Sequence, residues 1–167
     1  MKTLKLMTPV TDIATGLSGF ATTLWVDTDH RVRYMFQPTG INPENGQPVD
    51  RIDLELGRLE GYKESDMEDI DIPLEVLGTH VRDRASGFEG TATILIKHPN
   101  GCCHVMVQPK GVLKKTNSPI QRRDFDMRQL EGEKVPNLDE EQLRESKKKK
   151  PSPDGDAASV IDASVPV

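Results

Sequence analysis

The chain contains the same sequence twice. Residues 6–61 and 77–132 align without a gap at a constant offset of 71 (77 − 6 = 71). A repeat of this kind predicts two copies of one fold, and each copy, at about 55 residues, is near the lower size at which a core supports itself. We therefore expect the two units to pack against and stabilise each other. Identical pairs include Leu6/Leu77, Thr8/Thr79, Val10/Val81, Asp12/Asp83, Gly16/Gly87, Gly19/Gly90, Gln37/Gln108, Pro38/Pro109, Gly40/Gly111, Asp53/Asp124 and Leu59/Leu130.

Each repeat has the alternation and turn residues of short β-strands. Four strands are expected from polar and apolar alternation, β-branched runs and flanking Gly, Asn or Pro, and a short fifth segment ends at Leu-Glu-Gly. Five antiparallel strands in about 55 residues predict a small barrel of the Src-homology or Tudor kind. The expected fold class is all-β, with two tandem five-stranded barrels. The expected strands are 8–12, 19–26, 31–36 and 51–56 in the first repeat, and 79–83, 90–97, 102–107 and 122–127 in the second.

The segments outside the repeats are polar. Residues 62–76 are expected to form a flexible acidic linker, with an added edge strand through Ile70, Ile72 and Leu74 as the alternative. Residues 133–150 predict a short helix, starting near Asn137, and a lysine run. Residues 151–167 have too few apolar side chains to offset their ordering entropy and are expected to be disordered.

The net charge of −5 is unevenly distributed. Residues 6–61 hold four arginines against eight acids (−4), whereas 77–132 hold nine basic residues against five acids (+4). Three interpretations stay open: drift of solvated surfaces after duplication, attraction between the two units, and specialisation of the second for an anionic partner. The repeats also differ in the loops 39–50 and 110–121.

Composition favours a small cytosolic protein over a large enzyme. Aromatic residues make up only 4% and charged residues 29% of the chain. No apolar run approaches membrane-spanning length, and we expect no signal peptide or membrane anchor. The only cysteines, Cys102 and Cys103, are neighbours, so no disulfide framework is expected.

The densest group of reactive side chains is His98, Cys102, Cys103 and His104. Thiolate and imidazole bind transition metals, but neighbouring strand residues face opposite sides of a sheet, so the two cysteines cannot reach one ion. Cys103 aligns with Val32 and is expected to be a small buried hydrophobe.

Cys102 and His104 are expected on the opposite face, with Met106. A nucleophile pair is conceivable there, but the first repeat has Arg31 and Arg33 instead, and the sequence indicates no group that would orient the histidine. We expect no catalytic residue, no metal and no cofactor.

Other repeated residues have structural explanations. The Gly-x-x-Gly pattern admits a positive φ in the turn between the first two strands. The repeated carboxylates, of which Asp53 and Asp124 are examples, are expected to pair with the recurring Arg51 and Arg122 or to cap turns. Phe88, at a turn tip, is either a contact point or a lid on the core.

The second repeat is the better candidate for binding. Its basic residues could contact phosphates, although aromatic side chains for base stacking are scarce. The candidate binding residues are Phe88, Arg82, Arg84, Lys97, Lys110, Lys114, Lys115, Cys102 and His104.

A longer pattern resembles a known group of proteins. The segments Val81-x-Asp83-x-x-Ser86-Gly-Phe-x-Gly90-x-Ala-Thr93, Asn100-Gly-Cys102, Val107-Gln-Pro109 and Gln129-Leu-Glu131, with Asp124, are similar to small tailed-bacteriophage proteins of mostly unassigned function. Those proteins contain one such unit. The first repeat departs from the pattern at Asp29-His30-Arg31. The resemblance implies a phage origin and a small β-rich unit, and it carries no catalytic residues.

These features predict a non-enzymatic phage protein that acts by binding. The first expectation is a virion accessory or assembly component whose two equivalent units bridge copies of a protein partner. The alternatives are a host-directed protein that inhibits a defence factor or sequesters a nucleotide ligand, and a basic-barrel nucleic-acid binder. It is expected in the host cytoplasm during infection or in the virion, with no membrane partner and its oligomeric state left open.

Overall fold

The offset of 71 relates the strands as well as the residues. The computed structural model describes residues 1–137, and Met1–Pro136 form one compact unit. In the first repeat the elements are β2 (Pro9–Asp12), β3 (Ser18–Asp27), β4 (Val32–Pro38), β5 (Ile52–Leu54), the 3-10 turn η1 (Leu56–Arg58) and β6 (Leu59–Glu60). In the second they are β8 (His80–Asp83), β9 (Glu89–Lys97), β10 (Cys103–Gln108), β11 (Arg123–Asp126), η4 (Met127–Gln129) and β12 (Leu130–Glu131).

Both repeats have the same strand order. The first runs β6-β2-β3-β4-β5 and the second β12-β8-β9-β10-β11, and every pair is antiparallel. The all-β prediction is confirmed for residues 1–137, which contain no α-helix. In this part of the chain β5 does not pair with β6, nor β11 with β12, so the expected closed barrels are not found. The predicted helix near 137–147, the lysine run and the 151–167 tail fall outside the described residues, apart from Asn137.

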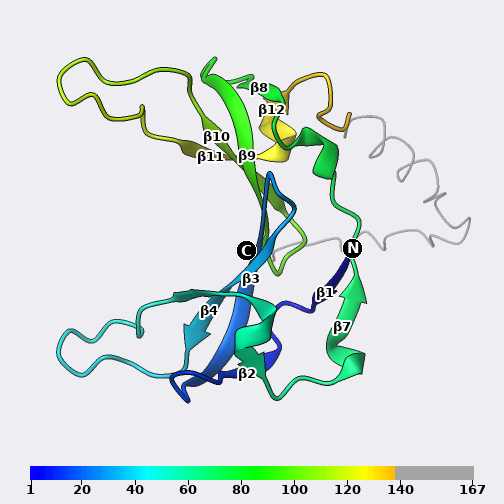
Figure 1. Cartoon of the computed structure of the whole chain (residues 1–167), viewed down its shortest axis with the longest axis vertical. Helices are drawn as coiled ribbons and strands as arrows, with labels where there is room; N and C mark the ends of the chain where they lie inside the picture. The colour runs from blue at the N-terminus through cyan, green and yellow to red at the C-terminus, as the bar shows by residue number, and fades with distance from the viewer. Residues whose placement is uncertain (138–167) are drawn as a thin grey trace, which may run out of the picture. The chain divides into compact units, whose positions relative to one another are not determined.

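The two repeats join edge to edge through their longest strands, β3 and β9 (Figure 1). The paired residues are Leu24 with Lys97, Trp25 with Ile96, Val26 with Leu95 and Asp27 with Ile94. Trp25 and Ile96 stand at the same position of the two repeats. Exchanging the two repeats therefore leaves the pairing register of the seam unchanged. A pseudo-twofold axis therefore passes through this pair and relates the two repeats.

The seam exists because β3 is longer than its own partner β2. Strand β2 pairs with β3 only at Ser18, Gly19 and Phe20, which leaves the second half of β3 open on that edge. The second half of β9 covers it, and unpaired backbone groups on both strands are satisfied. Buried side chains from both repeats belong to one hydrophobic cluster, which includes Leu24, Val26 and Leu95.

The segment between the repeats is folded, whereas the sequence predicted a flexible linker. It contains η2 (Glu64–Asp66), β7 (Met67–Asp69) and η3 (Leu74–Val76), and β7 pairs with the N-terminal strand β1 (Lys2–Leu4). This strand ends just before the edge strand expected as the alternative through Ile70, Ile72 and Leu74. Ile70 and Val76 are buried in the shared core. The backbone N–H of Leu4 donates to the buried Tyr34 hydroxyl at 2.9 Å.

Gly19 and Gly90 allow the closest backbone approach in the sheet. A Cβ at Gly19 would lie 2.1 Å from the Gln37 carbonyl oxygen, and one at Gly90 would lie 2.3 Å from that of Gln108. Only glycine fits at such a distance. In residues 1–137 we find no helix with the length and hydropathy needed to cross a bilayer.

Candidate binding surfaces

His104 lies on the outer face of β10, where it pairs across strands with Asp124 of β11. Its Nδ1 is 3.0 Å from Asp124 Oδ2. In the first repeat the equivalent residues are Arg33 and Asp53, whose Nε and Oδ1 are 2.8 Å apart. The carboxylates expected to pair with Arg51 and Arg122 thus have other partners. A cross-strand polar pair with an aspartate stands at the same place in both repeats, which indicates a role in holding the two strands together.

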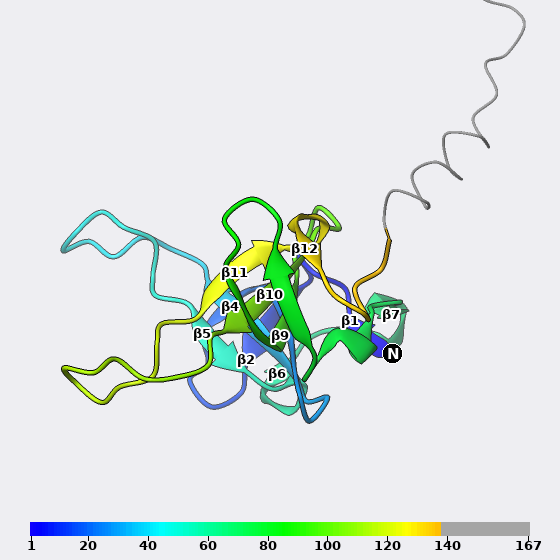
Figure 2. The ribbon, with the colours of Figure 1, turned by 90° about the horizontal axis from the view of Figure 1, so that it is seen from above.

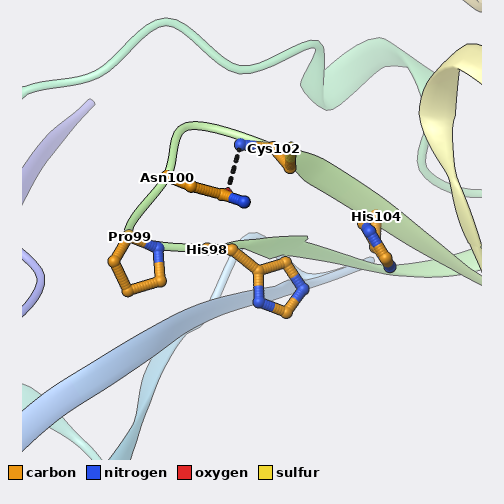
Figure 3. Close-up of a pocket in the computed structure, with 5 residues that line it drawn as sticks. All are labelled: His98, Pro99, Asn100, Cys102 and His104. Atoms are coloured by element: carbon orange, nitrogen blue, oxygen red, sulfur yellow. Dashed lines mark hydrogen bonds between the residues drawn. The ribbon is translucent and has the colours of Figure 1, made fainter.

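A shallow hollow beside His104 is lined by the β9–β10 turn (Figure 3). Its residues are His98, Pro99, Asn100, Cys102 and His104. The His98 and His104 rings meet edge to face at 4.7 Å between centroids. Burial, and then the nearby His104, lower the pKa of His98. His98 Nε2 is buried and has no hydrogen-bond partner among the described residues.

The two cysteines differ as predicted in the face that they occupy. Cys103 packs against the core, and burial raises the pKa of its thiol to about 11. Cys102 lines the hollow, and its backbone N–H bonds to Asn100 Oδ1. No hydrogen bond links Cys102 to His104 in the described residues, and no group of three or more His, Cys, Asp or Glu there is placed to hold a metal ion.

A second hollow lies on the other side of His104. It is lined by His104, Asp124, Phe125, Asp126, Arg128 and Gln129. Arg128 donates to Asp126 at 2.5 Å from Nη2. That contact, with the Arg128 backbone N–H, holds the pKa of Asp126 at about 2. Arg128 therefore compensates the charge of Asp126 within this hollow.

Three candidate residues of the second repeat make contacts within the chain. Phe88 packs on Phe125 with ring centroids 5.4 Å apart, and it covers the core as a lid. Arg82 pairs with Glu131 at 3.1 Å. Arg84 donates to the backbone carbonyls of Arg128 and Leu130. These partners leave the three side chains less available to an external ligand.

Each repeat has a buried aspartate at the turn between its first two strands. Asp12 accepts hydrogen bonds from the Thr15 hydroxyl and, at 2.9 Å each, from Nε and Nη2 of Arg58. These hydrogen bonds lower the pKa of Asp12. Asp83 accepts from Ser86 at 2.5 Å, which lowers its pKa, but Gln129 stands where the first repeat has Arg58. Asp83 Oδ1 has no partner among the described residues. Asp12 and Asp83 cap turns, one of the two roles expected for the repeated carboxylates, and Asp12 also pairs with an arginine.

The loops 39–50 and 110–121, called here the two arms, have the same conformation. In the first arm Asn42 N–H donates to Gln47 and Gly46 N–H to Asn42. At the equivalent places of the second arm Leu113 N–H donates to Ser118 and Asn117 N–H to Leu113, each bond being 2.8 Å in both arms. Asn117 adopts a φ of 51°, matching 68° at Gly46.

A glutamine side chain clamps each arm at its base. Gln37 Nε2 donates to the Val49 carbonyl at 2.6 Å, and Gln108 Nε2 to the Ile120 carbonyl at 2.7 Å. The arms leave the same side of the molecule in both views (Figures 1 and 2). The two arms differ in sequence but share one conformation that is held by hydrogen bonds at equivalent positions.

Apolar side chains are exposed on both arms. Ile41 is 61% exposed on the first, and at the second the exposure is 52% for the equivalent Val112 and 50% for Leu113. Large exposed apolar side chains on preformed loops are typical of contact surfaces. Sequence reasoning did not single out these three residues, although the identical Gly40/Gly111 and Gln37/Gln108 pairs signal the shared arm geometry.

The arms carry opposite charges. The first has Glu44 and Asp50 and no basic residue, whereas the second has Lys110, Lys114 and Lys115 and no acid. All five are exposed, and none forms an ion pair with another described residue. Lys97 is separate from this group, since it lies at the seam opposite Leu24.

Comparison of the chain with protein-family models, curated proteins and solved structures finds no match.

Proposed function

We propose that this chain is a non-enzymatic binding protein of a tailed bacteriophage, acting as a virion accessory or assembly component. In this proposal its two repeats bridge partners. The observation that carries it is the seam between β3 and β9, because the pseudo-twofold axis displays two arms of the same backbone shape from one chain. A chain with two similar contact faces can engage two sites of a symmetric assembly with a gain in avidity.

The proposal includes a fold assignment. Each repeat would be a partly open, five-stranded unit of the Src-homology type. Its support is the order in which the fifth strand lies beside the first, together with a 3-10 turn between the fourth and fifth strands. Small sheets of this kind commonly present their loops for recognition.

The comparison between repeats supports a non-enzymatic role. His104 with Asp124 could serve as an oriented base, which the sequence did not indicate. Arg33 with Asp53 fills the same cross-strand position in the first repeat, and an arginine cannot act as a general base because its guanidinium stays protonated. A structural cross-strand contact to an aspartate explains both repeats with one role.

Sedimentation of purified phage particles tests the proposal. An antibody to the chain should detect it in particles banded on a density gradient, and hydrogen exchange should show protection of equivalent segments in both repeats when particles bind. Absence from particles would contradict the virion role. Protection confined to one repeat would contradict bridging.

The three exposed lysines of the second arm favour nucleic-acid binding as a second candidate. A mobility-shift assay with duplex and single-stranded DNA tests it. Binding at low salt that weakens steeply as salt rises, and that depends on these lysines, would support this candidate.

A further inference from the structure

We infer that a partner of the two arms is a second copy of this chain. The basic arm 110–121 of one copy docks on the acidic arm 39–50 of the other, and the same contact forms a second time with the roles exchanged. The inference rests on the proposed role of the arms in binding. It names their occupant and predicts a closed dimer.

Charge complementarity is the first argument. Lys114 and Lys115 carry positive charge to the second arm, and Glu44 and Asp50 carry negative charge to the first. None of these four side chains has an ion-pair partner among the described residues. Complementary charges on one chain specify a copy of that chain as a matching surface.

The placement of the arms is the second argument. Both extend from one side of the molecule and are related by the pseudo-twofold axis (Figure 2). A second copy turned by 180° about an axis perpendicular both to that pseudo-axis and to the line joining the two arms brings each acidic arm opposite a basic one. The contact then closes on itself as an isologous dimer. Rotation about an axis parallel to the line joining the two arms would instead place like charges together, at an electrostatic cost.

The exposed apolar residues supply the third argument. Ile41 on one arm and Val112 and Leu113 on the other would be covered when the arms meet, which removes apolar surface from water. The arms hold their shape through their own backbone bonds and the Gln37 and Gln108 clamps, so docking orders little additional chain.

A polyanion fits the same surface less well. It would meet lysines on one arm but Glu44 and Asp50 on the other, with the acid-rich segment 62–76 in the same unit. A second copy satisfies both arms at once, and this is why we favour it over nucleic acid.

Charge reversal followed by mixing tests the inference on the full-length chain. Sedimentation equilibrium at low salt should show a monomer–dimer equilibrium that shifts toward monomer as salt rises. The double variant Lys114→Glu with Lys115→Glu has two acidic arms, and Glu44→Lys with Asp50→Lys has two basic arms. Each should raise the dimer Kd by about tenfold or more, because like charges then face each other.

Mixing the two double variants should restore association as a heterodimer, since both acidic arms of one meet both basic arms of the other. All four positions are exposed, so far-UV circular dichroism and the unfolding midpoint should stay near those of the parent chain. A parent chain that stays monomeric overturns the inference, as does a dimer unaffected by either variant or a mixture that does not associate.

These outcomes are separable from the proposed function. A monomer that still associates with phage particles would overturn the self-association but leave the virion role standing. A dimer absent from particles would do the reverse. A monomer that shifts DNA through Lys114 and Lys115 would replace the second copy with nucleic acid as the partner.

Discussion

Trp25 lies directly opposite Ile96 in the antiparallel pair of β3 and β9, and the two residues occupy the same position of the two repeats. On either side of this pair, Leu24 faces Lys97 and Val26 faces Leu95, and the offset of 71 converts one of these two pairs into the other. Because each repeat completes the open edge of the other, we expect the two halves of the described unit to unfold together.

Shortening Leu95 at the seam should destabilise both repeats. Its side chain is 1% exposed, and Leu95→Ala should cost about 2 to 5 kcal/mol through lost burial and a residual cavity. Urea unfolding followed by the fluorescence of Trp25, the only tryptophan, and by far-UV circular dichroism should give coincident single transitions. Ile13, which is 54% exposed and lies outside both arms, gives the control, and Ile13→Ala should change stability by less than about 0.5 kcal/mol. Separate transitions for the two probes would show that the repeats unfold independently.

Adding a methyl group at Gly19 or Gly90 should be strongly destabilising. The new Cβ would overlap a backbone carbonyl that belongs to the sheet, so the strands must separate locally. We expect a loss of roughly 3 kcal/mol for Gly19→Ala and for Gly90→Ala in chemical unfolding. Gly57→Ala is the matched control, because nothing lies within 4 Å of its Cβ position. Equal effects at all three positions would disprove the steric explanation.

Acid should weaken the fold partly through Asp126. Its pKa of about 2 is below the ordinary 3.8, so its contribution is complete above pH 4 and is lost as the pH falls toward 2. Arg128→Gln should move this pKa back toward 3.8 and reduce that part of the acid loss. Carboxyl-carbon NMR titration measures the shift directly. Arg82→Gln removes an arginine that pairs with Glu131 and should leave the Asp126 titration unchanged.

The adjacent cysteines should react at different rates. With a pKa of about 11, Cys103 has very little thiolate at pH 8, whereas Cys102 lines an open hollow. Iodoacetamide should add once to the native chain quickly and a second time only in denaturant, as followed by intact mass. Cys102→Ser should abolish the fast addition, and Cys103→Ser should preserve it. Rapid double labelling of the native protein would contradict the burial of Cys103.

Local patterns predicted much of the fold. The strand expected at 19–26 is Ser18–Asp27, and the one expected at 31–36 is Val32–Pro38, because alternation and turn residues act over short distances. The pairing of β3 with β9 joins residues far apart in sequence, and no local signal encodes it. The many acids of the 62–76 segment predict flexibility, yet Ile70 and Val76 are buried in the core.

The candidate site was predictable to a similar extent. Alignment with Val32 placed Cys103 toward the core, but the pairing of His104 with Asp124 depends on the register of β10 against β11. Arg82 and Arg84 looked available as charges in the sequence, and only the structure shows their partners. The sequence shows that the arms differ between the repeats, whereas only the structure shows their common hydrogen-bonding scheme.

The self-complementary seam also explains how the arms could come to differ. Two separate copies of one unit, meeting across such a joint, would be encoded by one gene and would always display identical arms. Fusion of the copies into one polypeptide keeps the joint and lets each arm accumulate its own substitutions. Glu44 and Lys115 stand at the same position of the two repeats but carry opposite charges, a difference that a homodimer of single units could not acquire.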